Sequence, residues 1–429
     1  MSDLKIVIAG VGTVGSGVLN LLKKNHRKIE SKIGKKVNVV GIASRREFKS
    51  KQFKNTKIFS DAIELTSFNN YDVLIELIGG SDGVAKEIVF DALKKKKNVI
   101  TANKALISKH GNELIKISNS NKAYIGFEAA VAGGIPIITI LENFLVSNSI
   151  KTVVGILNGT SNYILSKMFE TKKDFKAILH QAQSLGYAET DPTFDINGTD
   201  TAHKLSILAS LAFKKKINIK KVYISGIQDI DYIDLRVADE LGYKIKLVGI
   251  TKKLKSKIIQ YVYPCLIKKN SLLGKVDNVC NGIIIESDSS KKLFLQGEGA
   301  GSLPTATSVL SDLCRISSLS KSSFTNEKLK TLGKENSIMI SQRVGSYYLR
   351  INTYDKPGVI ADISKSLKKY SISIKSLYQK ENITEQNNYA HVVITTHNCT
   401  EKNLNNAIKV INKLSSTKKK VVVYRIETI

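Results

Sequence analysis

The sequence is poor in cysteine. Its four cysteines, Cys265, Cys280, Cys314 and Cys399, are scattered, and no two of them form a CxxC pair. This spacing indicates neither a disulfide framework nor a zinc site. A protein of a reducing compartment fits that composition, so we expect a cytoplasmic location.

Long hydrophobic runs are also absent. No uninterrupted apolar stretch approaches the ~20 residues needed to cross a bilayer. The first residues, MSDLKIVIAGVG, contain no basic region followed by a cleavage site, so no signal peptide is expected. A chain of 429 residues with 42% hydrophobic and 24% charged residues predicts two or three globular domains and no membrane partner.

Arginine is scarce although the formal net charge is +29. Only eight of the 66 basic residues are arginine, and the lysines are spread along the whole chain. Base readout and bidentate phosphate contacts favour arginine. We therefore expect a solvated basic surface and no nucleic-acid partner. The alternative, a nucleic-acid binder, remains open, and duplex binding that disappears under salt would indicate charge alone.

The first third of the chain alternates strand-like and helical segments. The runs at 4–10, 37–43, 73–78 and 99–102 are apolar without alternation, which is typical of strands buried on both faces of a parallel sheet. Strands separated by helices predict βαβ units. We expect an α/β dinucleotide-binding domain of Rossmann type at residues 1–131.

Three further segments follow. Residues 132–315 mix helices and strands, which predicts an α+β catalytic and dimerisation domain whose last helix, 303–316, packs back on the first domain. Residues 316–346 are polar and rich in Ser and Lys, as in a linker. Residues 347–429 have a βαββαβ order, which is ferredoxin-like.

The segment AGVGTVGSG carries a G-x-G-x-x-G pattern at Gly10, Gly12 and Gly15. In such a loop the glycines allow a tight turn and a close approach to a pyrophosphate, with the helix N-terminus facing the phosphates. The pattern lies between a predicted strand and a predicted helix, which is the context the motif requires. The alternative is a glycine turn that serves packing alone.

The second predicted strand ends without an acid that could bind the ribose hydroxyls of NAD. Arg45 and Arg46 follow it instead. Arginine at this place suits a 2′-phosphate, so NADP is favoured and NAD stays open. The alternative is a pair of surface arginines.

Two other segments carry candidate site residues. Lys104, in TANK, follows the end of a predicted strand, where doubly wound sheets bind ligands. Glu128 lies in the nearly apolar FEAAVAGGIPII before a Gly-Gly-Ile-Pro turn. A carboxylate and backbone carbonyls suit a hard cation. From the residues alone, an ordinary helix N-terminus with Pro136 in its first turn is the favoured account.

The stretch GYAETDPTFDINGTDTAHKL gathers acids in a chain rich in lysine. If a helix starts near residue 199, Asp200 and Lys204 are at i and i+4 and share one face. The arrangement indicates either a capped helix after a solvated loop or a pocket for a cationic small molecule. For His203, on another side of that helix, packing is the favoured role. The acids are Glu189, Asp191, Asp195 and Asp200.

Several segments resemble one enzyme family. ELIGG, TANKAL, FEAAVAGGIPII, GILNGTSNYIL, the stretch 182–213 and GEGAGSLPTA follow the order and spacing of bacterial homoserine dehydrogenase, over about residues 1–320. YDKPGVIADISKSLKKYSISIKSLYQ resembles an ACT domain, as in the single-function members with a C-terminal extension. The resemblance implies NAD(P)-dependent interconversion of L-homoserine and L-aspartate 4-semialdehyde, a branch step of threonine and methionine biosynthesis.

The resemblance also implies roles for particular residues. It makes Lys204 the proton donor, with Asp200 nearby and Lys104 as a second lysine beside the nicotinamide. The implied substrate-binding residues are Glu189, Asp195, Tyr187, Gly159 and Thr160. The implied cofactor loop includes Gly10, Gly12, Thr13, Val14 and Gly15, with Arg45, Lys104 and Gly299 also near the cofactor. Glu298 stands where many members have proline. The implied sodium site comprises Glu128, Val131, Gly133 and Ile135.

The ACT-like segment implies regulation and assembly. Asp355, Gly358 and Val359 lie in the loop where ACT domains commonly take an amino acid, so threonine is the expected effector. The alternative is a module for dimerisation or one without a function. From the resemblance we expect a homodimer or homotetramer.

Overall fold

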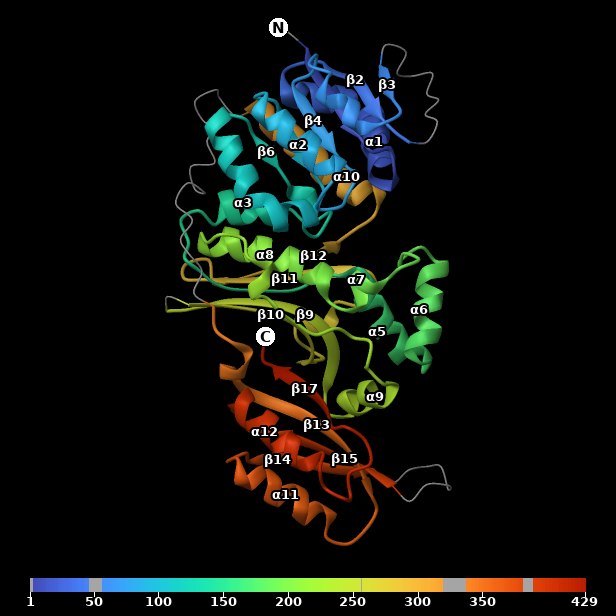
Figure 1. Ribbon diagram of the computed structural model, residues 1–429, viewed down its shortest axis with the longest axis vertical. Coiled ribbons are helices and arrows are strands. Elements are labelled where there is room, and N and C mark those ends of the chain that lie inside the picture. Colours follow the sequence, from blue (N-terminus) through green and yellow to red (C-terminus); the bar gives the residue numbers. More distant parts are fainter. Residues whose placement is uncertain (1–2, 46–55, 256, 319–336, 381–388) are drawn as a thin grey trace.

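The computed structural model describes residues 3–45, 56–255, 257–318, 337–380 and 389–429. The chain forms three parts that follow one another along the long axis, with the N-terminus at one end and the C-terminus near the middle (Figure 1). Arg46 and most of the expected linker lie outside the described residues. Within those residues, no helix is long and apolar enough to cross a membrane.

The first part is a parallel sheet with the strand order β3-β2-β1-β4-β5-β6. Ile6 and Ile8 of β1 pack with the helices of one face, and Val7 packs with those of the other. Both faces are therefore covered, and the predicted Rossmann-type sheet is confirmed. The strands are β1 (Leu4–Ala9), β2 (Val37–Ala43), β3 (Lys57–Phe59), β4 (Val73–Glu76), β5 (Asn98–Thr101) and β6 (Ile125–Gly126).

Helices cover the two faces of this sheet. They are α1 (Thr13–Ile33), α2 (Val84–Lys94), α3 (Lys104–Asn121) and, from much later in the chain, α10 (Ser302–Ser318). Helix α10 packs against α1, where the Ser302 hydroxyl donates to Thr13 O at 2.7 Å (Figure 1). A Cβ on Gly17 would lie 2.6 Å from Ser302 O, so the two helices approach closely at a glycine.

The connection to the second part contains only short helical turns. In place of one regular helix, the structure has α4 (Ile137–Thr139) followed by a π-helical turn, η3 (Ile140–Phe144). The amide of Leu145 donates to Ile140 O, five residues back, so the turn is wider than an α-helix. Four consecutive β-branched residues, 137–140, account for the poor helix, because their side chains crowd the preceding turn.

A second, mixed sheet forms the middle of the molecule, with β12-β11-β7-β9-β10 side by side. Helices α5 and α8 pack on the face that carries Val153 and Ile283. The strands are β7 (Ile150–Ile156), β8 (Tyr223–Ile224), β9 (Tyr243–Leu254), β10 (Lys257–Lys268), β11 (Cys280–Ser287) and β12 (Lys292–Glu298). The helices are α5 (Gly159–Thr171), α6 (Phe175–Ser184), α7 (Thr193–Ile196), α8 (Thr199–Phe213) and α9 (Tyr232–Glu240).

The third part has the expected βαββαβ order but continues the second sheet. Its strands lie in the order β17-β13-β15-β14, and β17 pairs in parallel with β10, where Cys265 faces Arg425. No local pattern in the sequence predicted this pairing. The elements are β13 (Val344–Tyr354), α11 (Val359–Lys369), β14 (Ile374–Lys380), β15 (Tyr389–Thr396), β16 (Cys399–Thr400), α12 (Glu401–Ile411) and β17 (Val422–Glu427).

Candidate active site

A cavity of about 590 Å³ lies at the carboxyl ends of β1, β2 and β4. Gly10 has a φ of +100°, and a Cβ there would lie 2.7 Å from Leu77 O. Gly12 precedes α1, and space around it is open. A Cβ on Gly15 would clash with Gly10 O, so helix and turn pack closely. The cavity has the loop, the room and the helix N-terminus that a dinucleotide pyrophosphate needs.

The ribose end of this cavity carries one described arginine. Arg45 lines it beside Ser44, and Arg46 lies outside the described residues. Asp61 also lines the cavity, which the sequence did not indicate because this acid comes after the following strand. Its side chain accepts from Ile63 N at 3.0 Å and caps a short 3₁₀ turn, so the carboxylate is already engaged.

The ends of β4 and β5 are tied together beneath the cavity. Glu76 is fully buried and accepts hydrogen bonds from Ile78 N, Gly79 N and the hydroxyl of Thr101. Burial raises the pKa of this carboxyl group. Asn103 caps α3 and also donates to Gly80 O at 2.6 Å. Lys104, the first residue of α3, is thereby held next to the loop that lines the cofactor cavity.

Two lysines meet at one carboxylate. Asp200 Oδ1 lies 2.7 Å from Lys104 Nζ, and Asp200 Oδ2 lies 2.8 Å from Lys204 Nζ. Lys204 also donates to Leu157 O at 2.7 Å. The side chain of Lys104 is 43% exposed, whereas that of Lys204 is 9% exposed. The first two turns of α8 therefore place a buried ammonium and a carboxylate against a lysine from the dinucleotide-binding part.

Asn158 joins this cluster, and no sequence pattern had singled it out. Its Nδ2 donates to Asp195 Oδ1 at 2.7 Å and to Asp200 Oδ2 at 2.8 Å. Its Oδ1 accepts from Ser161 N at 2.7 Å, which caps α5. An asparagine before Gly-Thr-Ser is a usual helix start in any protein, so its second role could not be recognised from type and spacing.

The charges in the cluster shift one another's pKa values. Burial alone would raise the pKa of Asp200, but the two lysines outweigh it and the net direction is downward. Asp195, which is half-buried and near Asp200, has a raised pKa. Asp200 raises the pKa of Lys104, whereas burial lowers that of Lys204, helped by the charge of Lys104. Of the two ammonium groups, Lys204 is thus the stronger acid.

The other expected substrate residues lie at the rim. Glu189 and Tyr187 are exposed, and the hydroxyl of Thr160 donates to Tyr187 O at 2.6 Å. A Cβ on Gly159 would lie 2.6 Å from Val279 O, so only glycine fits at the start of α5. Asp191 caps its own turn through Thr193 N at 3.1 Å. The acids therefore divide into the buried Asp200 and half-buried Asp195 near the lysines, and the exposed Glu189 and Asp191 at the rim.

His203 lies beside the cluster, in a packing position. Its Nδ1 is hydrogen-bonded to the hydroxyl of Ser108 in α3, and its ring stacks on Phe194 with centroids 6.4 Å apart. Burial lowers its pKa. These contacts join α8 to α3 and agree with the packing role expected from the sequence.

In the segment expected to bind sodium, the carboxylate of Glu128 accepts hydrogen bonds from the protein. Glu128 accepts from Ile138 N and Thr139 N at 2.8 Å each, and from the hydroxyl of Thr139. These hydrogen bonds agree with the helix-start account that the residues alone favoured. Ile135 O accepts from Ile137 N, and Gly133 O from Ser308. Each of these oxygens accepts hydrogen bonds within the protein and keeps a further lone pair, so the sodium site implied by the resemblance stays a prediction.

Gly299 and Glu298 lie next to that segment. Glu298 O accepts from Gly134 N at 2.9 Å, while the Glu298 residue is exposed. A Cβ on Gly299 would clash with the Asn281 side chain. Gly299 is buried in the turn between β12 and α10, so a side chain there would displace the turn against Asn281.

The loop of the third part begins α11. Gly358 has a φ of +89° and precedes the helix, Val359 is buried, and Asp355 is exposed, with its Oδ1 3.5 Å from Gln379 Nε2. Helix α11 lies at the opposite end of the molecule from α1, whose first residues line the cavity described above (Figure 1). An amino acid bound there would act on the lysine cluster only through the sheet and the helices between them.

Family models and related sequences point to the same enzyme family. The homoserine dehydrogenase model matches residues 136–314, and the model of the homoserine dehydrogenase NAD-binding domain matches residues 10–128. A homoserine dehydrogenase of Neisseria gonorrhoeae is 38% identical over 437 residues, covering 100% of both chains.

Solved structures agree with that match. A crystal structure of a homoserine dehydrogenase from Thiobacillus denitrificans superposes with a TM-score of 0.93 at 37% identity, covering 100% of this chain and 99% of that one. A hyperthermophilic archaeal homoserine dehydrogenase mutant in complex with NADPH has a TM-score of 0.62 at 26% identity, covering 73% of this chain and 97% of that chain. The chain therefore belongs to the homoserine dehydrogenase family of oxidoreductases, with an NAD-binding domain at its N-terminal end.

Proposed function

We propose that this protein reduces L-aspartate 4-semialdehyde reversibly to L-homoserine with NADPH, and that Lys204 gives the proton to the carbonyl oxygen. The observation that carries the proposal is Asp200, which holds the ammonium groups of Lys104 and Lys204 within 2.8 Å of its two oxygens. The pair of lysines lies where the dinucleotide-binding part meets α8. An aldehyde oxygen between a nicotinamide and α8 would face these groups.

The acids suit the amino group of the substrate. Aspartate semialdehyde carries an α-ammonium, and Glu189 and Asp195 lie close enough to the lysine cluster for their charges to act on Lys104. Asp195 is held by Asn158 at 2.7 Å, and Glu189 is exposed at the rim. Tyr187, Gly159 and Thr160 would line the substrate site beside these two acids. Charge-assisted hydrogen bonds from the ammonium to these carboxylates would fix the orientation of the aldehyde.

The lysines suit the chemistry at the aldehyde. A bound nicotinamide supplies a hydride to C4, and negative charge then develops on the carbonyl oxygen. Lys104 keeps its proton because Asp200 raises its pKa, so it stabilises that charge electrostatically. Lys204, whose pKa is lowered by burial, gives up a proton more readily and becomes the donor. In the reverse direction the neutral Lys204 accepts the proton of the homoserine hydroxyl.

The glycine loop and the arginine suit NADP. Gly10, Gly12, Thr13 and Gly15 would hold the pyrophosphate at the start of α1, and Val14 lies in the first turn of that helix. Arg45 would bind a 2′-phosphate. A sodium ion held by Glu128, Val131, Gly133 and Ile135, as the resemblance implies, would take no part in these steps.

We also infer the roles of the larger parts. Residues 1–131 bind the dinucleotide, 132–315 carry the substrate site and a dimer interface, and 347–429 form an ACT domain after the linker 316–346. Asp355, Gly358 and Val359 would bind threonine in a homodimer or homotetramer. This effector role is excluded if saturating L-threonine gives no binding heat and leaves the rate unchanged.

The reaction is tested by following NADPH oxidation with purified protein and L-aspartate 4-semialdehyde. Lys204→Met keeps the length of the side chain and removes the ammonium, so kcat is expected to fall ~10²–10⁴-fold, the usual contribution of a general acid. Lys116→Met, at an exposed position of α3, is the matched control and is expected to retain the parent rate. Near-normal turnover by a folded Lys204→Met protein contradicts the assignment.

A further inference from the structure

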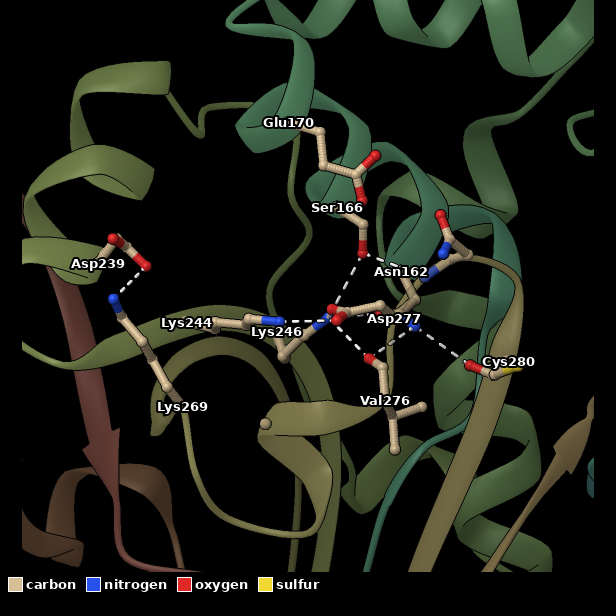
Figure 2. Close-up of polar contacts among 12 residues, drawn as sticks. Asn162, Ser166, Glu170, Asp239, Lys244, Lys246, Lys269, Val276, Asp277 and Cys280 are labelled. Carbon is tan, nitrogen blue, oxygen red and sulfur yellow. Dashed lines mark hydrogen bonds and ion pairs between the residues drawn. The ribbon is translucent and has the colours of Figure 1, made fainter.

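A second cavity, of about 150 Å³, lies between α5, α9 and β9. It is separate from the dinucleotide cavity and shares no residue with the lysine cluster. Ser166, Phe169 and Glu170 line it from α5, and Leu235 and Asp239 from α9. Figure 2 shows Asn162, Ser166 and Glu170 along one helix, with Lys244, Lys246 and Asp277 below them. Several charged groups thus converge on one small cavity.

The floor of the cavity is positive and rigid. Lys246 is 1% exposed, and its Nζ donates to Asn162 Oδ1, Val276 O and Asp277 Oδ1 at 2.8 Å each. Lys244 Nζ lies 2.7 Å from the other oxygen of Asp277. One carboxylate is therefore shared between two ammonium groups, which leaves one positive charge in excess at this end.

A hydroxyl completes this positive end. The Oγ of Ser166 accepts from Asn278 N at 3.3 Å and lies 3.5 Å from Lys246 Nζ. A serine hydroxyl that accepts in this way still has its own proton to donate. Lys244 and Ser166 can therefore both donate to a carboxylate in the cavity, while Lys246 adds its charge from below.

The rim on the other side is negative. Glu170 pairs with Lys167 of the same helix at 2.5 Å, and its side chain is 45% exposed. Asp239 pairs with Lys269 at 2.5 Å (Figure 2). Exposed ion pairs of this kind contribute little to stability, so either carboxylate can turn to a new cation at small cost. An ammonium group entering between α5 and α9 would meet both.

The wall between the two ends is apolar, formed by Leu165, Phe169 and Leu235. A volume of 150 Å³ corresponds to about five water molecules. A nucleotide is far too large for this space. A molecule of that size with a carboxylate, an ammonium group and a short uncharged side chain matches the three surfaces together.

We propose that this cavity binds a small neutral α-amino acid, with its carboxylate toward Lys244 and Ser166 and its ammonium toward Glu170 and Asp239. The proposal goes beyond the reaction proposed above and does not rest on it. The site lies between two helices with other tasks: α5 starts at the substrate side with Gly159, and α9 carries Asp234, which binds Arg350 of the third part at 2.6 Å.

The chain contains no tryptophan, which allows a direct test. Phe169→Trp places the only indole of the protein on the cavity wall, and its fluorescence is followed while L-valine is added. A saturable change in emission is expected. Isovalerate and isobutylamine, which each keep one charged end of valine, are expected to produce no saturable change over the same range.

Matched variants in the Phe169→Trp background locate the binding. Glu170→Gln removes one charge from the negative rim, and Lys244→Gln removes one charge from the positive end of the cavity. Either is expected to raise the midpoint about tenfold or more, which corresponds to ~1.4 kcal/mol. Glu189→Gln at the substrate side and Asp355→Ala in the third part are expected to leave the midpoint unchanged.

Three results would overturn the proposal. Emission that stays constant up to tens of millimolar L-valine shows that the cavity takes no such ligand. A midpoint that moves with Glu189→Gln or Asp355→Ala, and stays unchanged in Glu170→Gln and Lys244→Gln, places the binding elsewhere. Isovalerate that titrates as well as L-valine shows a carboxylate site in place of an amino-acid site.

Discussion

At the scale of single residues, Asp312 is a buried acid with an unusual pKa. It lies in α10, is 2% exposed and accepts from Glu128 N at 2.9 Å. Burial raises its pKa to about 8, and the charge of Glu128 acts in the same direction. The folded state therefore keeps a proton that the unfolded chain releases near pH 4. Stability is lost as the pH rises from about 4 to about 8.

Asp312→Asn removes this titration and keeps an acceptor for Glu128 N. The variant is expected to match the parent near pH 4 and to gain ~1.4 kcal/mol on it per pH unit up to about pH 8, the slope for one linked proton. Urea unfolding of both proteins at pH 5, 6 and 7 measures the difference. A gap that does not widen with pH would mean that Asp312 is ionised in the folded protein.

Arg45 is a second residue whose role can be measured alone. If it binds the 2′-phosphate of NADPH, Arg45→Ala is expected to lower kcat/KM for NADPH by about tenfold or more, for the loss of a charge-assisted contact of ~1.5–3 kcal/mol. The value for NADH is expected to stay near that of the parent. Arg27→Ala, in α1, is the control. If the ratio of kcat/KM for NADPH to kcat/KM for NADH is unchanged, Arg45 is a surface residue that does not bind the 2′-phosphate.

At the scale of elements, α5 depends on Asn158 for both its start and its place in the site. Asn158→Ala loses the cap of α5, which costs ~1 kcal/mol, and also the hydrogen bonds to Asp195 and Asp200. Asp174→Ala loses the cap of the neighbouring α6, where Asp174 accepts from Ala177 N at 2.8 Å. Similar losses of stability are expected for both, and a large fall in kcat/KM for Asn158→Ala alone. Equal kinetics in the two variants would make Asn158 a cap and nothing more.

The same elements show what the sequence could predict. The glycine loop was placed because Gly10, Gly12 and Gly15 occur between a strand and a helix, which local residues define. Lys204 and Asp200 were paired because helical spacing brings i and i+4 together. Local spacing could join neither Lys104 nor Asn158 to them, since the contacts of Asp200 with these residues cross from α8 to α3 and α5. The family resemblance placed Lys104 with them, and nothing placed Asn158. Only packing decides such contacts.

At the scale of the whole molecule, one buried carboxylate joins the third part to the second. Asp234 of α9 is 0% exposed and accepts from Arg350 Nε at 2.6 Å and Nη2 at 2.9 Å. The hydroxyls of Tyr348 and Tyr424 donate to it at 3.1 Å and 3.2 Å. Together with the pairing of β17 and β10, this contact joins the second and third parts into one continuous unit. The polar linker between them had suggested two separate units.

The third part is therefore expected to unfold independently of the second only when this contact is broken. Arg350→Met leaves Asp234 buried without its ion partner, which costs ~3–5 kcal/mol. Asp234→Leu in turn leaves the guanidinium of Arg350 buried without its ion partner. The double variant is expected to cost clearly less than the sum, because neither charge is then left alone.

Urea unfolding, followed by circular dichroism and by NADPH binding, measures both the cycle and its consequence. In the parent, β13–β17 and the middle sheet are expected to unfold in one transition. In Arg350→Met, circular dichroism is expected to show an earlier step, while NADPH binding persists, since the dinucleotide cavity lies at the far end of the molecule. Additive costs with a single coincident transition in every variant would show that the β10–β17 pairing alone holds the third part in place.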